Sequence, residues 1–184
     1  MVEPAMTTVI TDINIQQTLE SMAAEIRQTL AGKQPLLIGI HSGGVWVAEE
    51  LAKILSSEFF DGDLGVLNIA YYRDDFTRIG MHPQVTPSDL PFPVEDRHLL
   101  LIDDVLYSGR TIRAALNEIF DYGRPASVTL AVLIKRNGRE LPVQADIIGH
   151  TLELTTDQQV KLCNTDGLQL ELKNKGDPAR LTTS

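Results

Sequence analysis

The sequence predicts an α/β fold with a central, mostly parallel, twisted sheet flanked by helices. Continuously apolar runs occur at Leu36–Ile40 (LLIGI), Leu99–Ile102 (LLLI) and within Ala126–Ile134 (ASVTLAVLI), and such runs are typical of strands buried on both faces of a parallel sheet. The first two runs lead into small-residue loops and then into helical patterns, which is the strand–loop–helix order of this fold class. At 184 residues the chain is long enough for a single domain with a substantial core.

The first part of the chain is expected to alternate helices and strands. Apolar residues at helical spacing predict a helix over Asn14–Leu30, which Gly32 would end as a C-terminal cap. The strand at Leu36–Ile40 precedes a second helix over Val45–Leu55. Aromatic and β-branched residues then predict a strand over Leu64–Tyr72.

A long polar segment, Arg73–Asp96, follows and contains four prolines. A stretch of this length without secondary structure in a compact domain is typically functional or disordered. The functional interpretation is a flexible lid that closes over a ligand site. The alternative is a solvated loop whose arginines contact nothing.

The second part of the chain is predicted to complete the sheet and to add shorter strands. Its elements are, in order, a strand from Leu99, a helix over Ile112–Phe120, a buried strand over Ala126–Ile134, a polar turn over Lys135–Pro142, strand-like pieces within Pro142–Leu152 and Gln159–Leu172, and a frayed polar tail from Lys173.

The stretch Leu99–Thr111 (LLLIDDVLYSGRT) carries the strongest functional signal. Asp103 and Asp104 stand where the strand is expected to end, and Ser108–Thr111 forms the loop before the next helix. Ligands of open α/β sheets bind at the carboxyl ends of strands, and a helix N-terminus offers N–H groups to a phosphate. Carboxylates accept hydrogen bonds from sugar hydroxyls or hold a cation, so the pattern predicts a phosphoribosyl site. The alternative is an ordinary strand–helix junction with a capping acid.

A second junction has the composition of a phosphate-binding loop. His41, Ser42, Gly43 and Gly44 come directly after the strand at Leu36–Ile40. Close approach of the backbone to a diphosphate requires small side chains. The sequence therefore predicts a second phosphate-binding loop at this position.

The string IDDVLYSGRT resembles the phosphoribosyl-diphosphate (PRPP) binding motif of type I phosphoribosyltransferases, and most closely that of the pyrimidine-operon regulator family, which doubles as uracil phosphoribosyltransferase. The similarity continues upstream through YYRDD and downstream through RAALNEIFDYGRPASVTLAVLI and RELPVQADIIGH. It covers the chain from about Gly39 to Leu172. The resemblance implies the type I phosphoribosyltransferase fold with a small hood at about 136–172, and transfer of the phosphoribosyl group from PRPP to uracil, giving UMP and pyrophosphate.

The resemblance also implies roles for individual residues. Asp103 and Asp104 would orient the ribose and contact Mg²⁺, and Arg73, at the entrance of the lid, would contact the diphosphate. Arg136 and Ile148 are candidates for the base pocket. The residues implied to hold PRPP or the nucleotide are His41, Ser42, Gly43, Gly44, Val105, Leu106, Tyr107, Ser108, Gly109, Arg110 and Thr111.

Two positions depart from patterns of related proteins. Members of the regulator family usually have a threonine–arginine–glycine triplet where Ser42, Gly43 and Gly44 stand, so a positive charge on the diphosphate is missing. Either His41 or an arginine elsewhere compensates, or PRPP binds more weakly. Purine-salvage relatives have an aspartate where Tyr107 stands, and tyrosine is a poor base near neutral pH. This difference favours uracil over hypoxanthine and guanine.

The composition restricts the partners of the chain. Sixteen basic against 25 acidic residues give a net charge of −9 at pH 7, and the first seventy residues hold three basic and nine acidic side chains. Nucleic-acid binders usually present a basic face, so the charge disfavours RNA as a partner but leaves room for a local basic patch. No apolar run reaches the length of a membrane span, and no signal peptide is evident.

The single cysteine, Cys163, suits a reducing compartment and is expected to pack rather than to act as a nucleophile. We therefore expect a cytoplasmic protein without membrane partners. The family resemblance implies a homodimer or a higher homo-oligomer.

Three functions remain open. The first is a uracil phosphoribosyltransferase, with UMP-sensing regulation of pyrimidine genes as a second activity. The second is an RNA-binding regulator of pyrimidine-operon attenuation with weak or no enzyme activity. The third is a protein that binds nucleotide without turnover, which the missing loop arginine suggests.

Overall fold

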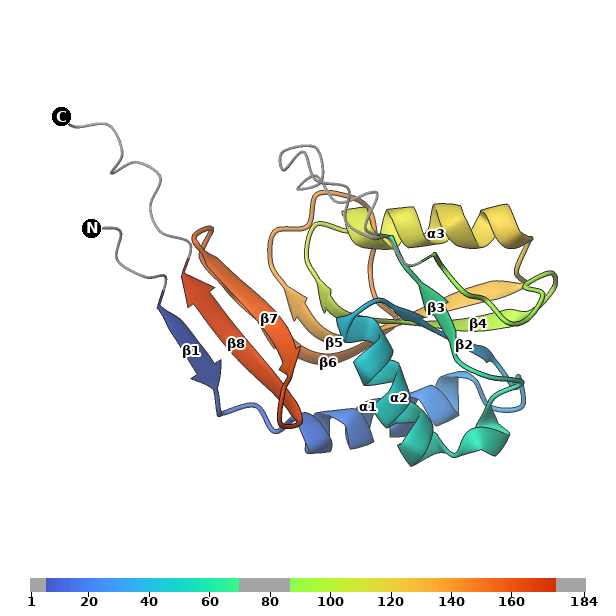
Figure 1. Cartoon of the computed structure of the whole chain (residues 1–184), viewed down its shortest axis with the longest axis horizontal. Coiled ribbons are helices and arrows are strands. Elements are labelled where there is room, and N and C mark those ends of the chain that lie inside the picture. The colour runs from blue at the N-terminus through green and yellow to red at the C-terminus, as the bar shows by residue number, and fades with distance from the viewer. Residues whose placement is uncertain (1–5, 70–86, 175–184) are drawn as a thin grey trace.

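A five-stranded parallel sheet forms the centre of the computed structural model, which describes residues 6–69 and 87–174 (Figure 1). Its strand order is β3-β2-β4-β5-β6, and every neighbouring pair is parallel. The strands are β2 (Leu36–Ile40), β3 (Gly65–Leu67), β4 (His98–Leu106), β5 (Ser127–Arg136) and β6 (Ile147–Leu152). The predicted fold class is confirmed.

Helices cover both faces of this sheet. Helices α1 (Ile15–Thr29) and α2 (Gly43–Leu55) lie on one face and α3 (Arg110–Tyr122) lies on the other; a short 3₁₀ helix, η1 (Ser57–Phe59), follows α2 (Figure 1). Alternate strand residues pack into the two layers: Leu100 belongs to the core under α1 and α2, and Leu101 to the core under α3. This two-sided burial explains the uninterrupted apolar runs. Within the described part of the chain, no helix has both the length and the apolar character needed to cross a membrane.

Helix α1 matches its prediction to within one residue at each end. Asn14 is the N-cap, and its side-chain oxygen accepts a hydrogen bond of 3.0 Å from the Gln17 N–H. The C-cap is Leu30, whose N–H donates to the Ile26 carbonyl. Gly32, with φ of +72°, lies in the turn beyond, so the prediction that Gly32 caps the helix is wrong.

The C-terminal region and the N-terminus together form a second, antiparallel sheet with the strand order β1-β8-β7. Its strands are β1 (Thr7–Ile10), β7 (Gln158–Asn164) and β8 (Leu168–Asn174). Strand β1 was not predicted, because its four residues show no clear alternation and are stabilised by pairing with β8, which is distant in sequence. We call this sheet and the turn 153–157 before β7 the hood. Val160, Leu162 and Leu170 join the core beneath α1 and α2.

Strand β3 is shorter than predicted. It ends at Leu67, after which the Asn68 N–H donates to the Ser88 hydroxyl at 2.9 Å. Val66 and Asp89 form an isolated antiparallel bridge. Asn68 and Ile69 are not part of the strand, and the last three residues of the predicted strand, 70–72, lie outside the described part of the chain.

The segment predicted as a lid is described only from residue 87 onward. Asp89 exchanges two backbone hydrogen bonds with Val66, of 2.7 and 2.8 Å. Val94 is fully buried in the core beneath α3, and Phe92 packs against that core. Residues 87–96 are therefore bound to the body of the protein, and the rest of the lid prediction falls outside the described residues.

Cys163 lies half-buried in β7. Burial raises the pKa of its thiol above the ordinary value, and the hydrogen bond and negative charge of Glu171 raise it further. A raised pKa keeps the thiol protonated near neutral pH, which agrees with the expected packing role.

Candidate functional site

Strand β4 continues through both acids of the central motif and ends at Leu106. The prediction that the strand ends at Asp103 is therefore wrong. Strand β2 pairs with β4 only as far as Gly39 opposite Ile102, because β2 then turns into α2. Strand β5 stays paired to β4 up to Leu106. The acids thus lie on a part of β4 that pairs with β5 but no longer with β2, so the sheet is open on the β2 side of the acids.

The two carboxylates differ in accessibility. Asp103 is 3% exposed, whereas Asp104 is half-buried. Oδ1 of Asp103 accepts a hydrogen bond from the Asp104 N–H, and Oδ1 of Asp104 accepts one from the Val105 N–H, both at 2.9 Å. Asp104 is therefore the carboxylate that a ligand meets first.

The start of α2 lies directly against these acids. The helix begins at Gly43, two residues before the predicted start, so Gly43 and Gly44 form its first turn. A Cβ at Gly43 would overlap the Asp104 carboxylate, and a Cβ at Gly44 would lie 2.5 Å from the Ile102 carbonyl oxygen. The structure thus places the predicted phosphate-binding loop next to Asp104.

The two residues before α2 complete this loop. Ser42 is the N-cap, and its side chain makes no capping hydrogen bond. The peptide bond between His41 and Ser42 is cis. The His41 side chain is exposed, and its backbone N–H donates to the Leu67 carbonyl at 2.8 Å.

The loop between β4 and α3 consists of Tyr107, Ser108 and Gly109, which we call the β4–α3 loop. Helix α3 begins at Arg110, so Arg110 and Thr111, predicted in the loop, lie in the first helical turn. Gly109 is the N-cap with φ of +93°, a left-handed conformation that favours glycine. First-turn N–H groups have no acceptor within their helix, so they are available to an anion.

The segment after β5 holds the β4–α3 loop in place. The Ser108 carbonyl accepts hydrogen bonds from the N–H groups of Glu140 and Leu141, both at 3.0 Å. The Arg110 guanidinium forms an exposed ion pair with Glu140 at 2.9 Å. The Arg110 side chain is therefore directed to Glu140, while its backbone N–H, in the first turn of α3, donates to the Ser108 hydroxyl at 3.2 Å.

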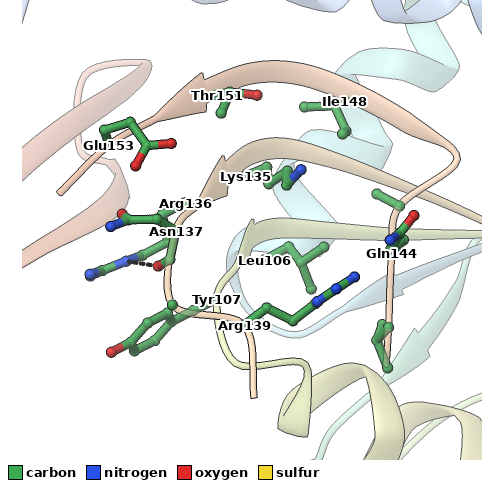
Figure 2. Close-up of a pocket in the computed structure, with 13 residues that line it drawn as sticks. Leu106, Tyr107, Lys135, Arg136, Asn137, Arg139, Gln144, Ile148, Thr151 and Glu153 are labelled. Atoms are coloured by element: carbon green, nitrogen blue, oxygen red, sulfur yellow. Dashed lines mark hydrogen bonds between the residues drawn. The ribbon is translucent and has the colours of Figure 1, made fainter. Parts of the chain in front are cut away.

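A cavity of about 360 Å³ lies beside the β4–α3 loop, at the carboxyl ends of β4 and β5 (Figure 2). Both predicted base-pocket residues, Arg136 and Ile148, line it, as does Tyr107. The complete lining is Leu106, Tyr107, Lys135, Arg136, Asn137, Gly138, Arg139, Val143, Gln144, Ala145, Ile148, Thr151 and Glu153. Apolar side chains near Ile148 and polar groups from the segment after β5 together suit a planar, polar-edged molecule.

Six polar residues of this lining were not among the predicted site residues, namely Lys135, Asn137, Arg139, Gln144, Thr151 and Glu153. Strand β5 extends two residues past its predicted end, and this extension carries Lys135 into the cavity (Figure 2). No hydrogen bond or ion pair to another described residue involves the side chains of Lys135 or Arg139. The signal available in the sequence was a Lys–Arg pair at the carboxyl end of a buried strand.

Arg73 lies among residues 70–86 and so outside the described part of the chain. Among the described residues, no group of three or more His, Cys, Asp or Glu side chains could hold a metal ion. Mg²⁺ is commonly bound by one or two carboxylates together with substrate phosphates. The adjacent Asp103 and Asp104 have that donor set, with Asp104 accessible.

Comparisons with known proteins agree on one family. Residues 8–164 match the family described as phosphoribosyl transferase domain. The chain is 61% identical to "Bifunctional protein PyrR" of Nitrosococcus oceani over 164 residues, covering 88% of this chain and 92% of the relative. It is 53% identical to the protein of the same name from Pseudomonas aeruginosa (strain LESB58) over 163 residues, covering 87% and 94%.

Solved structures show the same fold at low sequence identity. A hypoxanthine-guanine phosphoribosyltransferase from Bacillus anthracis has a TM-score of 0.64 and 13% identity, covering 91% of this chain and 98% of the other. A hypoxanthine phosphoribosyltransferase from Staphylococcus aureus has a TM-score of 0.61 and 18% identity, covering 83% and 78%. At these identities the similarity concerns the fold alone.

Proposed function

Because this chain belongs to the phosphoribosyl transferase family and, within it, to the bifunctional PyrR proteins, we propose that it transfers the phosphoribosyl group of PRPP to uracil, giving UMP and pyrophosphate. The family predicted from the motif is confirmed. The observation that carries the proposal is the accessible Asp104 carboxylate, which lies against the first turn of α2 on the strand that leads into the β4–α3 loop.

The N-termini of α3 and α2 bind the two ends of PRPP, the 5′-phosphate and the diphosphate respectively. The β4–α3 loop and the first turn of α3 bind the 5′-phosphate through backbone N–H groups, with the Ser108 and Thr111 hydroxyls as further donors. The first turn of α2 binds the diphosphate, where Gly43 and Gly44 permit close approach of the backbone. Arg73 supplies positive charge to the leaving diphosphate. The lid segment that begins at Arg73 limits access of water to the reacting carbon.

The acids hold the sugar between these two ends. Asp104 accepts hydrogen bonds from ribose hydroxyls, and the more buried Asp103 orients the Asp104 backbone. Asp103 and Asp104 would hold Mg²⁺ together with the diphosphate, where the ion supplies neutralisation of the leaving group's charge. The protein's contribution is mainly positioning and charge stabilisation.

The base lies in the cavity over Ile148, beside Tyr107. Lys135 can only donate hydrogen bonds, whereas the Gln144 amide can both donate and accept. A lysine that faces the 4-position donates to the O4 carbonyl of uracil, while the Gln144 amide pairs with the N3–H edge. In that placement Lys135 disfavours cytosine, which carries an amino group at the 4-position. Two features favour uracil over an oxopurine. One is Tyr107, which stands where purine-salvage relatives have an aspartate, and the other is the similarity of this chain to PyrR proteins.

Replacing Lys135 with methionine is expected to lower kcat/KM for uracil by about 10- to 100-fold, the usual cost of a charge-assisted hydrogen bond. The preference for uracil over cytosine should fall with it. Steady-state kinetics with both bases measure the change. Lys161→Met, an exposed lysine of β7, is the matched control and should behave as the unmodified protein. Unchanged uracil kinetics in Lys135→Met would contradict the role of Lys135.

The decisive experiment is a turnover assay with PRPP and Mg²⁺ across uracil, cytosine, hypoxanthine and guanine. We expect pyrophosphate release that depends on uracil and stops when EDTA removes the metal. Release with a purine but not with uracil would overturn the base assignment. UMP binding without any release would instead identify a nucleotide-binding protein without turnover.

The PyrR relationship favours a second function, namely UMP-sensitive regulation of pyrimidine genes through RNA. Because the net charge of the chain is −9, binding to a pyrimidine leader transcript should be weak, strengthened by UMP and strongly dependent on salt. A gel-shift titration over a salt series tests this. No binding at low salt, with UMP present, would remove RNA as a partner.

We also propose that the chain self-associates as a homodimer or higher homo-oligomer, as the family resemblance implies. Light scattering coupled to size exclusion, with and without PRPP, measures the assembly. A monomer under both conditions would contradict this part of the proposal.

A further inference from the structure

Arg136 is a buried cation at the end of β5. The residue is 6% exposed, and none of the ion pairs among the described residues includes it. Charged side chains are seldom buried without partners. The partners here are backbone carbonyls: Nη1 donates to Gln158 at 2.8 Å and Nε to Asn137 at 3.2 Å, with Nη2 3.5 Å from the Thr155 oxygen.

The face of the same guanidinium lies on the Tyr107 ring. The Arg136 Cζ is 4.0 Å from the ring centroid, which is a cation–π geometry. The ring also lies against Gly138, where a Cβ would be 2.5 Å from the Tyr107 Cε2. Although Tyr107 is 42% exposed, these contacts determine where its ring stands.

Two of the three carbonyls near Arg136, those of Thr155 and Gln158, belong to the hood, at the turn that leads into β7. The third is the carbonyl of Asn137, which directly follows β5. The neighbouring Asn137 strengthens this attachment: its amide donates to the Leu154 carbonyl at 2.9 Å, and its oxygen accepts from the Leu154 N–H at 2.8 Å. The end of β5 is therefore joined to the hood at several points.

We propose that Arg136 is a positioning residue that ties the β4–α3 loop to the hood and thereby sets one wall of the base cavity. Arg136, Asn137 and Tyr107 all line that wall (Figure 2). Because three nitrogens of the guanidinium face backbone carbonyls and its plane faces a ring, Arg136 acts on the base through Tyr107 and the hood. This role rests on the proposed function for the identity of the ligands.

Kinetics of single and double variants test this role. Arg136→Met is expected to raise KM for uracil and Kd for UMP about tenfold, with a smaller change in kcat. Arg136→Lys should recover only part of the loss, because an ammonium lacks the planar fork of arginine. Tyr107→Leu should resemble Arg136→Met, and Tyr107→Phe, which keeps the ring, should lose less.

The double variant Arg136→Met/Tyr107→Leu distinguishes coupled from separate roles. We expect it to be no worse than the weaker-binding single variant, because both changes break the same contact. Additive losses would show that Arg136 acts on the ligand independently of Tyr107, and would overturn the inference. So would an unchanged KM and Kd in Arg136→Met, whatever its thermal stability.

Hydrogen exchange without any ligand provides a test that is independent of activity. Arg136→Met should speed amide exchange at residues 107–109 and at 154–158 together, whereas Arg113→Met, an exposed arginine of α3, should leave both unchanged. Faster exchange in only one of these segments, or in neither, would overturn the inference. If the unmodified protein shows no turnover but exchange responds in both segments, the proposed function fails and the positioning role stands.

Discussion

Replacing both Asp103 and Asp104 with asparagine is expected to lower kcat/KM for UMP formation by about 10³-fold, as loss of a preorganised electrostatic contact does in other enzymes. The change removes two negative charges that we assign to the ribose and Mg²⁺. Asparagine has nearly the same size and keeps an oxygen that can accept from the Asp104 and Val105 N–H groups. Pyrophosphate release measures the loss, and thermal unfolding checks that the fold persists.

The single variants should differ because the two side chains differ in exposure. Asp104→Asn is expected to cause the larger loss, since Asp104 is half-buried while Asp103 is 3% exposed. Asp121→Asn, an exposed carboxylate on α3, is the matched control and should retain full activity. Full activity in the double variant would refute the proposed site. An equal or larger loss for Asp103→Asn would show that ligand binding exposes the buried carboxylate.

Gly44→Ala is expected to have the largest effect on stability. Helix propensity alone would favour alanine by about 0.5–1 kcal/mol. Here, however, the new Cβ would lie 2.5 Å from the Ile102 carbonyl oxygen, a backbone atom that cannot rotate away. Overpacking of this kind costs about 1–3 kcal/mol, so after the gain in helix propensity we expect a net loss of about 1 kcal/mol. Urea unfolding measures it, and Tm should fall by about 2–4 °C.

Gly43→Ala provides a contrast at the neighbouring position. Its Cβ would overlap Oδ2 of Asp104, which can rotate away, and would lie 2.8 Å from the Asp104 Cβ, which side-chain rotation does not move. We therefore expect a smaller loss of stability than in Gly44→Ala, together with a fall in kcat/KM, because the Asp104 carboxylate leaves its place. Glu49→Ala, an exposed position on α2, controls for the introduction of alanine. Unaltered stability in Gly44→Ala would contradict the close packing of α2 on β4.

The same geometry bears on the arginine that related proteins carry in this loop. Any side chain at position 43 would displace the Asp104 carboxylate from its present position. Restoring an arginine there would therefore move an acid of the site while adding a cation. Gly43→Ala separates these two effects, since it adds the Cβ without the charge.

Most of the architecture could be predicted because its signals are local. The periodicity of α1 and the apolar runs of β2, β4 and β5 record burial directly, so α1, β2 and β5 were expected at nearly their observed bounds and β4 at nearly its observed start. The central motif likewise carries its own chemistry in neighbouring residues, which identified the acids and the β4–α3 loop. Strand β1 had no such local signal, since it is held by pairing with β8.

The sequence by itself determined the fold class and the family, and it singled out the two strand–helix junctions that we propose as the site. Only the tertiary structure decided that β4 continues past the acids, because β5 stays paired after β2 has turned away. It also decided that Asp104 rather than Asp103 is accessible, and that Arg136 is bound to the hood while Lys135 reaches the cavity. These outcomes depend on contacts between residues far apart in the chain, which local spacing does not record.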